Sequence, residues 1–431
     1  MTEQRNIKIT VPVLARVEGE GALDIELENN VIKHLALRIY EPPRYFEKFL
    51  EGRSHLDVPD MVARICGICP VAYQMSAVKA LEQAFDFTPS QWTLNMRRLM
   101  YCGEWIQSHS LHIHLLAAPD FLGFDNALEM SVQHPQIVQR GLRLQNLGNE
   151  IIRFLGGRSV HPVGVVTGGF HKAPSMQDAQ NLLAQLQDAK DDCHSLIDWT
   201  CSLNLPDNSQ DIISVSMFNE DEYPMYHGQI KTSQGLLISA EEFEQHFIEH
   251  HEPHSTALHA LHNGKPYLVG PLARINLNHE LIPADTLALL KKHSIVFPSN
   301  NIFHSIIARA IELQIAISSA AHILKHYFVS TEPVEKITTR ASTGFSFTEA
   351  PRGLLWHKYT TDNQGYISYA KIVPPTSQNQ AQMESDLRFS IMNFGLNKDD
   401  DELRHYSETI IRNYDPCISC ATHFLKLKVN R

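Results

Sequence analysis

The chain has 431 residues, 43% hydrophobic and 20% charged, so it is long enough to bury a large core and has the composition of a soluble globular protein. Its formal net charge of -11 argues against a nucleic acid as its partner. The longest apolar stretch, residues 302–328, is interrupted by charged and histidine side chains, which predicts a buried helix and no membrane span. No secretory signal begins the chain, and we expect a cytoplasmic protein.

Hydropathy patterning predicts an α+β protein that is predominantly helical, with a central bundle of long helices, a small N-terminal antiparallel sheet and peripheral β segments. The predicted N-terminal strands are Ile7–Val13, Ala22–Glu28 and Val31–Ile39. The predicted long helices are Val71–Phe85, Leu94–Leu116, Gln136–Leu155, Ser175–Leu203 and Asn301–Phe328. Short strands are expected at Gln229–Lys231, Leu236–Ile238 and Tyr267–Val269, a strand–turn block at Lys336–Ile372, and a last helix at Glu402–Arg412, stopped by Asp415-Pro416.

The sequence contains no low-complexity linker, charge block or fixed-period repeat that would divide the chain. Two C-x-x-C pairs lie near its opposite ends, at residues 66–69 and 417–420. If both pairs serve one site, the two ends must meet in the core. We therefore predict a single interleaved domain, residues 1–431.

The paired cysteines, Cys66 with Cys69 and Cys417 with Cys420, predict a soft metal site. Each C-x-x-C brings two sulfurs within reach of one metal, and Pro70 can occupy the first turn of a helix whose positive end stabilises a Cys69 thiolate. Structural zinc is the commonest use of such pairs and is the alternative. Zinc ribbons usually place their pairs close together, however, and a chain of this size needs no metal to hold it folded.

The residues around the two pairs carry a specific resemblance. Residues 64–70 read R-I-C-G-I-C-P, and residues 415–423 read D-P-C-I-S-C-A-T-H. Together they resemble the paired signatures of nickel–iron hydrogenase large subunits. The resemblance implies that Cys66 and Cys417 are terminal nickel ligands and that Cys69 and Cys420 bridge nickel to iron. It also implies that the iron carries carbon monoxide and cyanide.

An N-terminal stretch, R-V-E-G-E-G at residues 16–21, resembles a family segment whose glutamate lies beside a nickel-bound cysteine and relays protons. Heterolytic cleavage of dihydrogen needs a base near the metal and an exit route for the proton. The resemblance assigns that role to Glu18, which otherwise would be interpreted as a surface turn residue.

The stretch R-Y-F-E at residues 44–47 resembles one whose glutamate helps bind a second metal, usually magnesium. The resemblance implies Glu47, the backbone carbonyl of Ile372 and His423 as the protein ligands. Carboxylate, carbonyl and water ligands suit a hard cation, and the histidine leaves Fe²⁺ as an alternative. Residues 108–121 resemble a helical segment whose closing aspartate, Asp120, packs near the bimetallic centre.

The motif E-A-P-R-G resembles one whose arginine, Arg352, holds its guanidinium over the open metal site. A permanently charged group with five donors can hydrogen-bond a cyanide, and Asp415 is its expected partner. The following V-P-P-T resembles a stretch whose hydroxyl, that of Thr376, donates to the other cyanide. Tyr73 stands where many relatives have histidine, and its hydroxyl can donate toward a bridging sulfur.

The resemblance implies the reaction H2 ⇌ 2H+ + 2e−, with Cys417 or Arg352 accepting the first proton and Glu18 passing it outward. No cysteines remain for a chain of clusters, so an iron–sulfur small subunit is implied. The stretches E-P-P-R-Y-F-E and C-P-V-A-Y-Q-M are most similar to those of the cytoplasmic branch of the family. The resemblance implies that electrons pass to NAD(P) through flavin and iron–sulfur diaphorase subunits. Some members of this branch also reduce sulfur.

The last eight residues, 424–431, are expected to be a tail that a maturation protease removes after nickel-insertion chaperones have loaded the site. Three other functions stay open at this point. They are a hydrogen sensor, a zinc-stabilised structural protein, and a quinone-site subunit like the homologous one of respiratory complex I. The complex I subunit has lost the cysteines that this chain keeps. A zinc-stabilised protein would contain zinc in place of nickel and iron. A hydrogen sensor would contain the same metals as the enzyme but turn over slowly.

Overall fold

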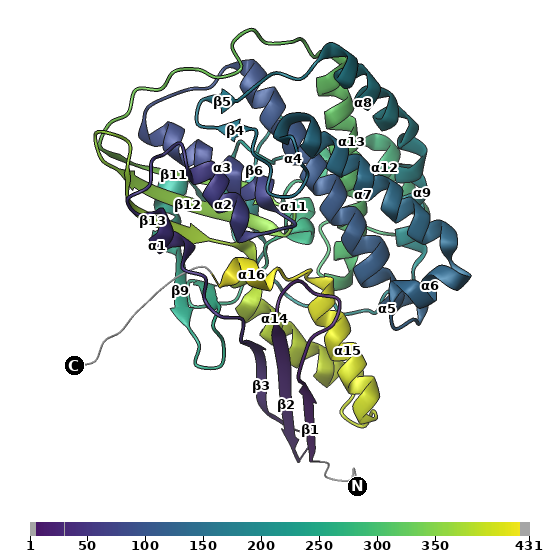
Figure 1. The fold of residues 1–431 in the computed structure, drawn as a ribbon. Coiled ribbons are helices and arrows are strands. Elements are labelled where there is room, and N and C mark those ends of the chain that lie inside the picture. Colours follow the sequence, from purple (N-terminus) through teal and green to yellow (C-terminus); the bar gives the residue numbers. More distant parts are fainter. Residues whose placement is uncertain (1–5, 30, 423–431) are drawn as a thin grey trace, which may run out of the picture.

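The computed structural model describes residues 6–29 and 31–422 (Figure 1). The strands are β1 (Ile7–Val11), β2 (Gly21–Glu28), β3 (Val31–Ile39), β4 (Val165–Val166), β5 (Gly169–Phe170), β6 (Val215–Phe218), β7 (Gln229–Thr232), β8 (Leu237–Ile238), β9 (Phe247–His251), β10 (Leu258–His262), β11 (Ser342–Ala350), β12 (Gly353–Thr361) and β13 (Ile367–Val373). The helices are α1 (Phe46–Leu50), α2 (Val58–Val62), α3 (Pro70–Ala84), α4 (Gln91–Leu111), α5 (Ala118–Leu122), α6 (Ala127–Gln133), α7 (Pro135–Gly156), α8 (Met176–Asp188), α9 (Lys190–Ser202), α10 (Phe243–His246), α11 (Pro271–Leu277), α12 (Ala284–Lys292), α13 (Ser305–Lys325), α14 (Pro375–Phe394), α15 (Asp400–Asn413) and α16 (Ile418–Ala421).

Long helices form a bundle in which α4 packs against α7 and α13, and α13 also contacts α8 and α9 (Figure 1). Helices α4 and α7 approach closely at Gly103 and Gly148, where a Cβ added to Gly148 would lie 2.5 Å from the Gly103 carbonyl oxygen. Only glycine permits this contact between the backbones of α4 and α7. The predicted central bundle is confirmed.

The strand–turn block predicted after residue 336 is an antiparallel sheet in the order β11-β12-β13, and α3 packs on it. A Cβ at Gly344 would lie 1.9 Å from the carbonyl oxygen of Ala80, so this glycine lets strand and helix approach. β11 and β12 are paired as far as Ala350 and Gly353. The tight turn between them carries Arg352.

The predicted N-terminal antiparallel sheet is present; its strand order is β1-β2-β3, with Ile9 opposite Ile25. β3 contacts α14 and β1 contacts α15, so elements from the two ends of the chain lie side by side (Figure 1). The backbone of Glu18 forms a parallel bridge with that of Cys417. The N- and C-terminal segments therefore meet, as the cysteine spacing predicted.

Some predicted elements were wrong. The helix predicted over residues 175–203 is two helices, α8 and α9, separated at Ala189, and residues 267–269 make only an isolated bridge through Leu268. The helix expected to be the last, now α15, is followed by α16, and the whole of α14 was missed. The stretch Ile302–Lys325 is long and apolar enough to cross a membrane by length and composition, but 78% of its most apolar window is buried inside the protein.

Candidate metal centre

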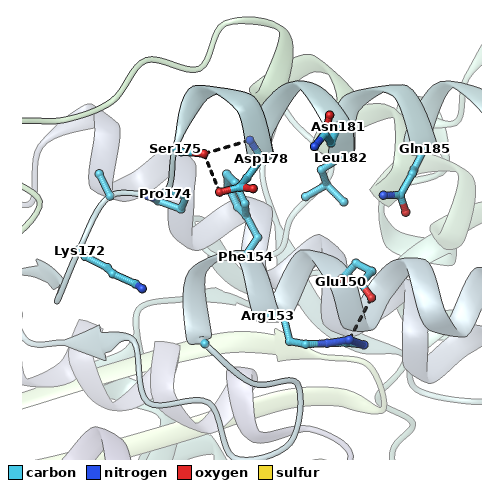
Figure 2. Close-up of a pocket in the computed structure, with 12 residues that line it drawn as sticks. Glu150, Arg153, Phe154, Lys172, Pro174, Ser175, Asp178, Asn181, Leu182 and Gln185 are labelled. Atoms are coloured by element: carbon cyan, nitrogen blue, oxygen red, sulfur yellow. Dashed lines mark hydrogen bonds and ion pairs between the residues drawn. The ribbon is translucent and has the colours of Figure 1, made fainter.

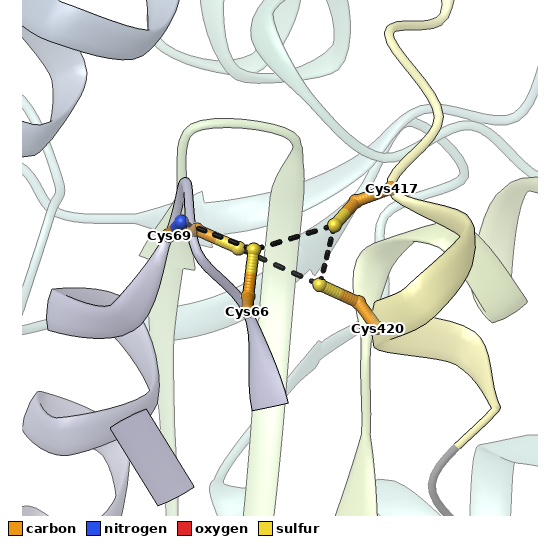
Figure 3. A group of neighbouring side chains, drawn as sticks. All are labelled: Cys66, Cys69, Cys417 and Cys420. Atoms are coloured by element: carbon orange, nitrogen blue, oxygen red, sulfur yellow. Dashed lines mark hydrogen bonds between the residues drawn. The ribbon is translucent and has the colours of Figure 1, made fainter. Parts of the chain in front are cut away.

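Four cysteine sulfurs from the two ends of the chain form one buried cluster (Figure 3). The Sγ atoms of Cys66 and Cys417 are 3.4 Å apart, those of Cys69 and Cys420 3.5 Å, and those of Cys417 and Cys420 2.6 Å. None of the four cysteines is in a disulfide, and each residue is at most 3% exposed. The ligand atoms lie within 4.8 Å of one another, which is the spacing that a small metal centre requires.

Local structure brings each pair of sulfurs together. Cys66 follows a 3-10 turn over residues 63–65, and its sulfur accepts hydrogen bonds from the amides of Ile68 at 3.3 Å and Cys69 at 3.1 Å. Cys69 is the residue before α3, which begins at Pro70 as predicted. Cys417 holds the same position before α16, so both pairs lie at the starts of helices.

Burial, hydrogen bonds between the sulfurs and the charge of Arg352 decide the charge of the sulfur cluster. Burial raises the pKa of the Cys69, Cys417 and Cys420 thiols because a thiolate loses its hydration in the core. Burial also opposes ionisation of Cys66, but hydrogen bonds from the other sulfurs and the charge of Arg352 hold the pKa of Cys66 well below its usual range. Negative charge is therefore favoured on the Cys66 sulfur, while burial favours the neutral thiol at the other three, so a cation that binds here has to displace their protons.

Glu18 reaches the cluster from the loop between β1 and β2. Its Oε2 accepts hydrogen bonds from Cys417 Sγ and from the Ser419 amide, both at 3.1 Å. The Ile418 amide donates to the Glu18 carbonyl at 3.0 Å, which holds the glutamate backbone against the C-terminal segment. Glu18 is only partly buried, so its carboxylate connects the sulfur cluster with a more accessible region.

Arg352, in the turn between β11 and β12, is near enough to the cluster for its charge to act on the Cys66, Cys69 and Cys417 sulfurs. Its Nε donates to the Asp415 carbonyl at 2.7 Å and its Nη2 donates to Asp415 Oδ1 at 3.0 Å, so the predicted Arg352–Asp415 contact is present. Nη1 is buried and has no hydrogen-bond partner among the described residues. Because buried donors are nearly always paired, this group suits a ligand that offers an acceptor there.

Thr376 and Tyr73 complete the surroundings of the sulfurs. The Cys417 amide donates to Thr376 Oγ1 at 2.9 Å, which leaves the threonine hydroxyl proton for another acceptor. Tyr73 is 1% exposed, and burial together with the nearby charge of Cys420 and Cys69 raises its pKa well above its usual range. Its hydroxyl therefore stays protonated and able to donate.

Asp120, predicted near the centre, contacts two arginines. Its carboxylate accepts from Arg16 and, at 2.8 and 2.9 Å, from Arg412. Arg16 lies two residues before Glu18 and Arg412 three residues before Asp415. Asp120 thus ties together the two segments that bring Glu18 and Asp415 to the site.

The residues predicted for a second metal are partly brought together. Glu47 Oε1 accepts a hydrogen bond from the Ile372 amide at 2.8 Å, so these two residues are neighbours. The contact uses the amide of Ile372, whereas the predicted ligand is its carbonyl. His423, the third predicted ligand, and the tail at residues 424–431 lie outside the described residues.

Two residues that organise the cysteine loops were missed by sequence reasoning. Glu104 of α4 is fully buried and accepts from the amides of Val71 at 2.6 Å and Ala72 at 3.0 Å, which caps the first turn of α3. The sequence feature that could have identified Glu104 is its position as a lone carboxylate in the apolar segment Y-C-G-E-W-I. Arg44 donates to the carbonyls of Ile65, at 2.7 Å, and Ser419, so it joins the two cysteine loops directly.

A pocket of about 550 Å³ lies elsewhere, between α7 and α8 (Figure 2). Its polar lining includes Arg153, Lys172 and Asp178, with Arg153 paired to Glu150 at 2.9 Å. None of the residues that line this pocket belongs to the sulfur cluster or to the groups around it. The chemistry therefore centres on the four sulfurs.

Comparisons with known proteins agree with this geometry. A family model described as nickel-dependent hydrogenase matches residues 44–143 and 241–423, which include both cysteine pairs. Sulfhydrogenase 1 subunit alpha of Pyrococcus furiosus is 31% identical over 98% of this chain and 99% of its own length. The NAD-reducing hydrogenase HoxS subunit beta of Cupriavidus necator is 29% identical over 97% of this chain and 95% of its own length. The crystal structure of an NAD+-reducing NiFe-hydrogenase in the H2-reduced state has a TM-score of 0.87 at 26% identity, and the match covers 97% of this chain and 99% of that one.

Proposed function

Because the chain belongs to the nickel-dependent hydrogenase family, as a catalytic large subunit, we propose that Cys66, Cys69, Cys417 and Cys420 hold its Ni–Fe centre. The observation that carries this proposal is the buried cluster of four cysteine sulfurs within 4.8 Å of one another. We assign Cys66 and Cys417 to nickel alone and Cys69 and Cys420 to both metals. The reaction is the reversible conversion of dihydrogen into two protons and two electrons.

When bound, the Ni–Fe centre supplies the heterolytic cleavage of dihydrogen. The protein's task is then to remove the proton. Cys417 Sγ is the first proton acceptor in our proposal, because its hydrogen bond to Glu18 Oε2, at 3.1 Å, gives the proton a direct path. The Ser419 amide holds the Glu18 carboxylate in place for this transfer, and the partial exposure of Glu18 provides the way out.

Arg352 and Thr376 position groups around the metals in this proposal. The unpartnered Nη1 of Arg352 and the hydroxyl proton of Thr376 are donors that suit cyanide ligands on iron. Asp415 orients the guanidinium through two hydrogen bonds, and Tyr73 keeps a protonated hydroxyl near the Cys420 sulfur.

We place a second cation, Mg²⁺ or Fe²⁺, between Glu47, the Ile372 carbonyl and His423. The contact between Glu47 and Ile372 supports this placement. Asp120 acts at a distance, by fixing Arg16 and Arg412. Residues 424–431 form a tail that a maturation protease removes after nickel-insertion chaperones have loaded the site.

The chain works as one interleaved domain, residues 1–431, and as one subunit of a larger cytoplasmic enzyme. Its relatives are named as subunits, and one of them as an NAD-reducing hydrogenase. We propose that electrons leave through an iron–sulfur small subunit and reach NAD(P) through flavin and iron–sulfur diaphorase subunits. The absence of further paired cysteines in the sequence supports clusters on a partner.

The test is infrared spectroscopy of the complex, purified anaerobically from its native host, together with metal analysis and the mass of this chain. We expect sharp bands of metal-bound carbon monoxide and cyanide, and a chain shortened after His423. The chain should hold one nickel with one iron if the second cation is Mg²⁺, or with two irons if it is Fe²⁺. Zinc alone, without these bands, would sink the proposal and identify a structural protein. Metals and bands with very slow turnover would identify a hydrogen sensor instead.

A further inference from the structure

A second cluster of metal-binding side chains lies on the β9–β10 hairpin and α14, apart from the cysteines. His254, His259 and Glu384 each offer one ligand atom, and these atoms lie within 4.8 Å of one another. Nε2 of His254 is 2.8 Å from Glu384 Oε1. Glu384 lies eight residues after Thr376 on α14, so it is about 12 Å along that helix from the residue that accepts from the Cys417 amide.

The most informative member of the cluster is His259. It is 2% exposed, and its Nε2 has no hydrogen-bond partner among the described residues. Buried ring nitrogens are nearly always satisfied by protein, water or metal. Burial, and then the neighbouring His254, His250 and His251, lower the pKa of His259 to about 3. The imidazole is therefore neutral at physiological pH, which is the form that binds metal.

A simple ion pair between His254 and Glu384 does not account for the arrangement. Such a pair satisfies those two side chains but leaves His259 Nε2 unpaired beside them. The His259 ring also lies edge-on to that of His254, with centroids 5.6 Å apart and an interplanar angle of 86°. Two imidazoles and a carboxylate that converge in this way match the donor set of many zinc sites.

The cluster is held by secondary structure and is open to solvent on one side. The Leu37 amide in β3 donates to Glu384 Oε1 at 2.9 Å, which orients the carboxylate. His259 is in register with His250 within the hairpin, so its backbone is fixed. The side chains of His254 and Glu384 are 25% and 20% exposed, and they leave an entry path and a place for a water ligand.

We propose that His254, His259 and Glu384 bind a divalent transition-metal ion of the zinc class, separately from the Ni–Fe centre. The ion displaces the His254–Glu384 hydrogen bond and takes one nitrogen from each imidazole and one oxygen from the carboxylate. A water completes a tetrahedral site. The bound ion ties the hairpin to α14, the helix whose first turn carries Thr376.

The test uses Zn²⁺ as the probe and the intact, metal-loaded complex. After equilibrium dialysis against low micromolar Zn²⁺, zinc, nickel and iron per chain are measured by elemental analysis. We expect one zinc per chain beyond the Ni–Fe metals, with zinc affinity at least about tenfold weaker in His259→Ala and His254→Ala. Nickel and iron content stays at the wild-type value, which separates this result from the outcome for the Ni–Fe centre.

Two further variants keep the test decisive. Glu384→Gln retains an oxygen acceptor for the Leu37 amide but weakens the metal ligand, and it serves if a histidine variant does not fold. His322→Ala is the matched control, because His322 and His326 form an exposed histidine pair at the C-terminal end of α13, with ring centroids 4.7 Å apart. Three results would each overturn the proposal. They are the absence of extra zinc in the wild type, a wild-type zinc affinity in both His259→Ala and Glu384→Gln, and the loss of zinc in His322→Ala.

Discussion

The thiol of Cys417 donates a hydrogen bond of 3.1 Å to the carboxylate of Glu18, a residue 399 positions away in the sequence. Backbone pairing between Glu18 and Cys417 holds the two residues in this relation, so the contact does not depend on a flexible side chain alone. A sulfur ligand and a carboxylate at this distance form a short proton path. The contact makes Glu18 the residue whose replacement tests the mechanism most directly.

Glu18→Gln keeps an oxygen that can accept from the Ser419 amide but cannot carry a proton. We expect hydrogen oxidation to fall by about 100-fold or more, while nickel content and the carbonyl and cyanide bands stay as in the wild type. The measurement is dihydrogen uptake with an artificial electron acceptor. Glu20→Gln is the control, since Glu20 is exposed two residues away and should retain full activity. A fully active Glu18→Gln enzyme would remove Glu18 from the proton path.

Arg352→Lys keeps the positive charge but loses the planar fork that binds Asp415 through both the carbonyl and the carboxylate. We expect turnover to fall by roughly 10- to 100-fold, because the charge is no longer held in position over the site. The cyanide bands should also shift, since the Nη1 donor is lost. Arg340→Lys, at an exposed position, is the control. Unchanged bands together with unchanged turnover would contradict the assignment.

Substitutions at Glu104 test whether this residue holds the start of α3, next to the first cysteine pair, in place. Glu104→Ala leaves the buried amides of Val71 and Ala72 without acceptors, and each costs about 1–3 kcal/mol. Glu104→Gln keeps one acceptor and should lose less stability. The thermal midpoints of the two variants, measured side by side, decide this. If Glu104→Ala unfolds no earlier than Glu104→Gln, the capping role is wrong.

Asp386 gives a pH-dependent prediction. Burial raises its pKa to about 7, although Tyr414, Gln382 and Gln210 donate hydrogen bonds to it. The unfolded chain releases this proton near pH 4, so between about pH 4 and 7 the folded form binds one proton more. The free energy of unfolding contributed by Asp386 is therefore fully present below pH 4 and is lost as pH rises to about 7.

Asp386→Asn removes this dependence. As pH rises from 5 to 8, the free energy of unfolding of the variant should increase relative to that of the wild type by up to about 3 kcal/mol. Thermal unfolding across this pH range measures the difference. A constant difference between Asp386→Asn and the wild type at all pH values would mean that Asp386 does not titrate in this range.

Elements with a clear period could be predicted from the sequence, and others could not. The strands over residues 7–11 and 31–39 alternate or run apolar, and they were found within two residues of their observed ends. Helix α14 was missed because its buried face carries polar residues, among them Gln378, Asn379 and Gln380, which have no apolar period. Two of these side chains are satisfied by tertiary partners: Gln378 donates to the Leu354 carbonyl at 2.6 Å, and Asn379 donates to the Val269 carbonyl at 3.1 Å.

The site was predictable where chemistry is carried by residue type and spacing. The cysteine pairs and the Arg352–Asp415 contact belong to this class. Arg44 was not predictable in the same way, because its role is to bridge the carbonyls of Ile65 and Ser419, and backbone positions leave no pattern in the sequence. The split of the predicted helix at Ala189 also lacks a signal, since neither glycine nor proline stands there.

The meeting of the two cysteine pairs has a consequence for the unfolded chain. Cys66 and Cys417 are 351 residues apart, so metals bound to both pairs would close a loop of most of the polypeptide. By the loop-closure relation, such a cross-link removes conformational entropy from the denatured ensemble worth about 6 kcal/mol. The loaded enzyme should therefore resist heat and denaturant far better than the empty one without any added native contact, and partly unfolded forms keep their two ends tethered.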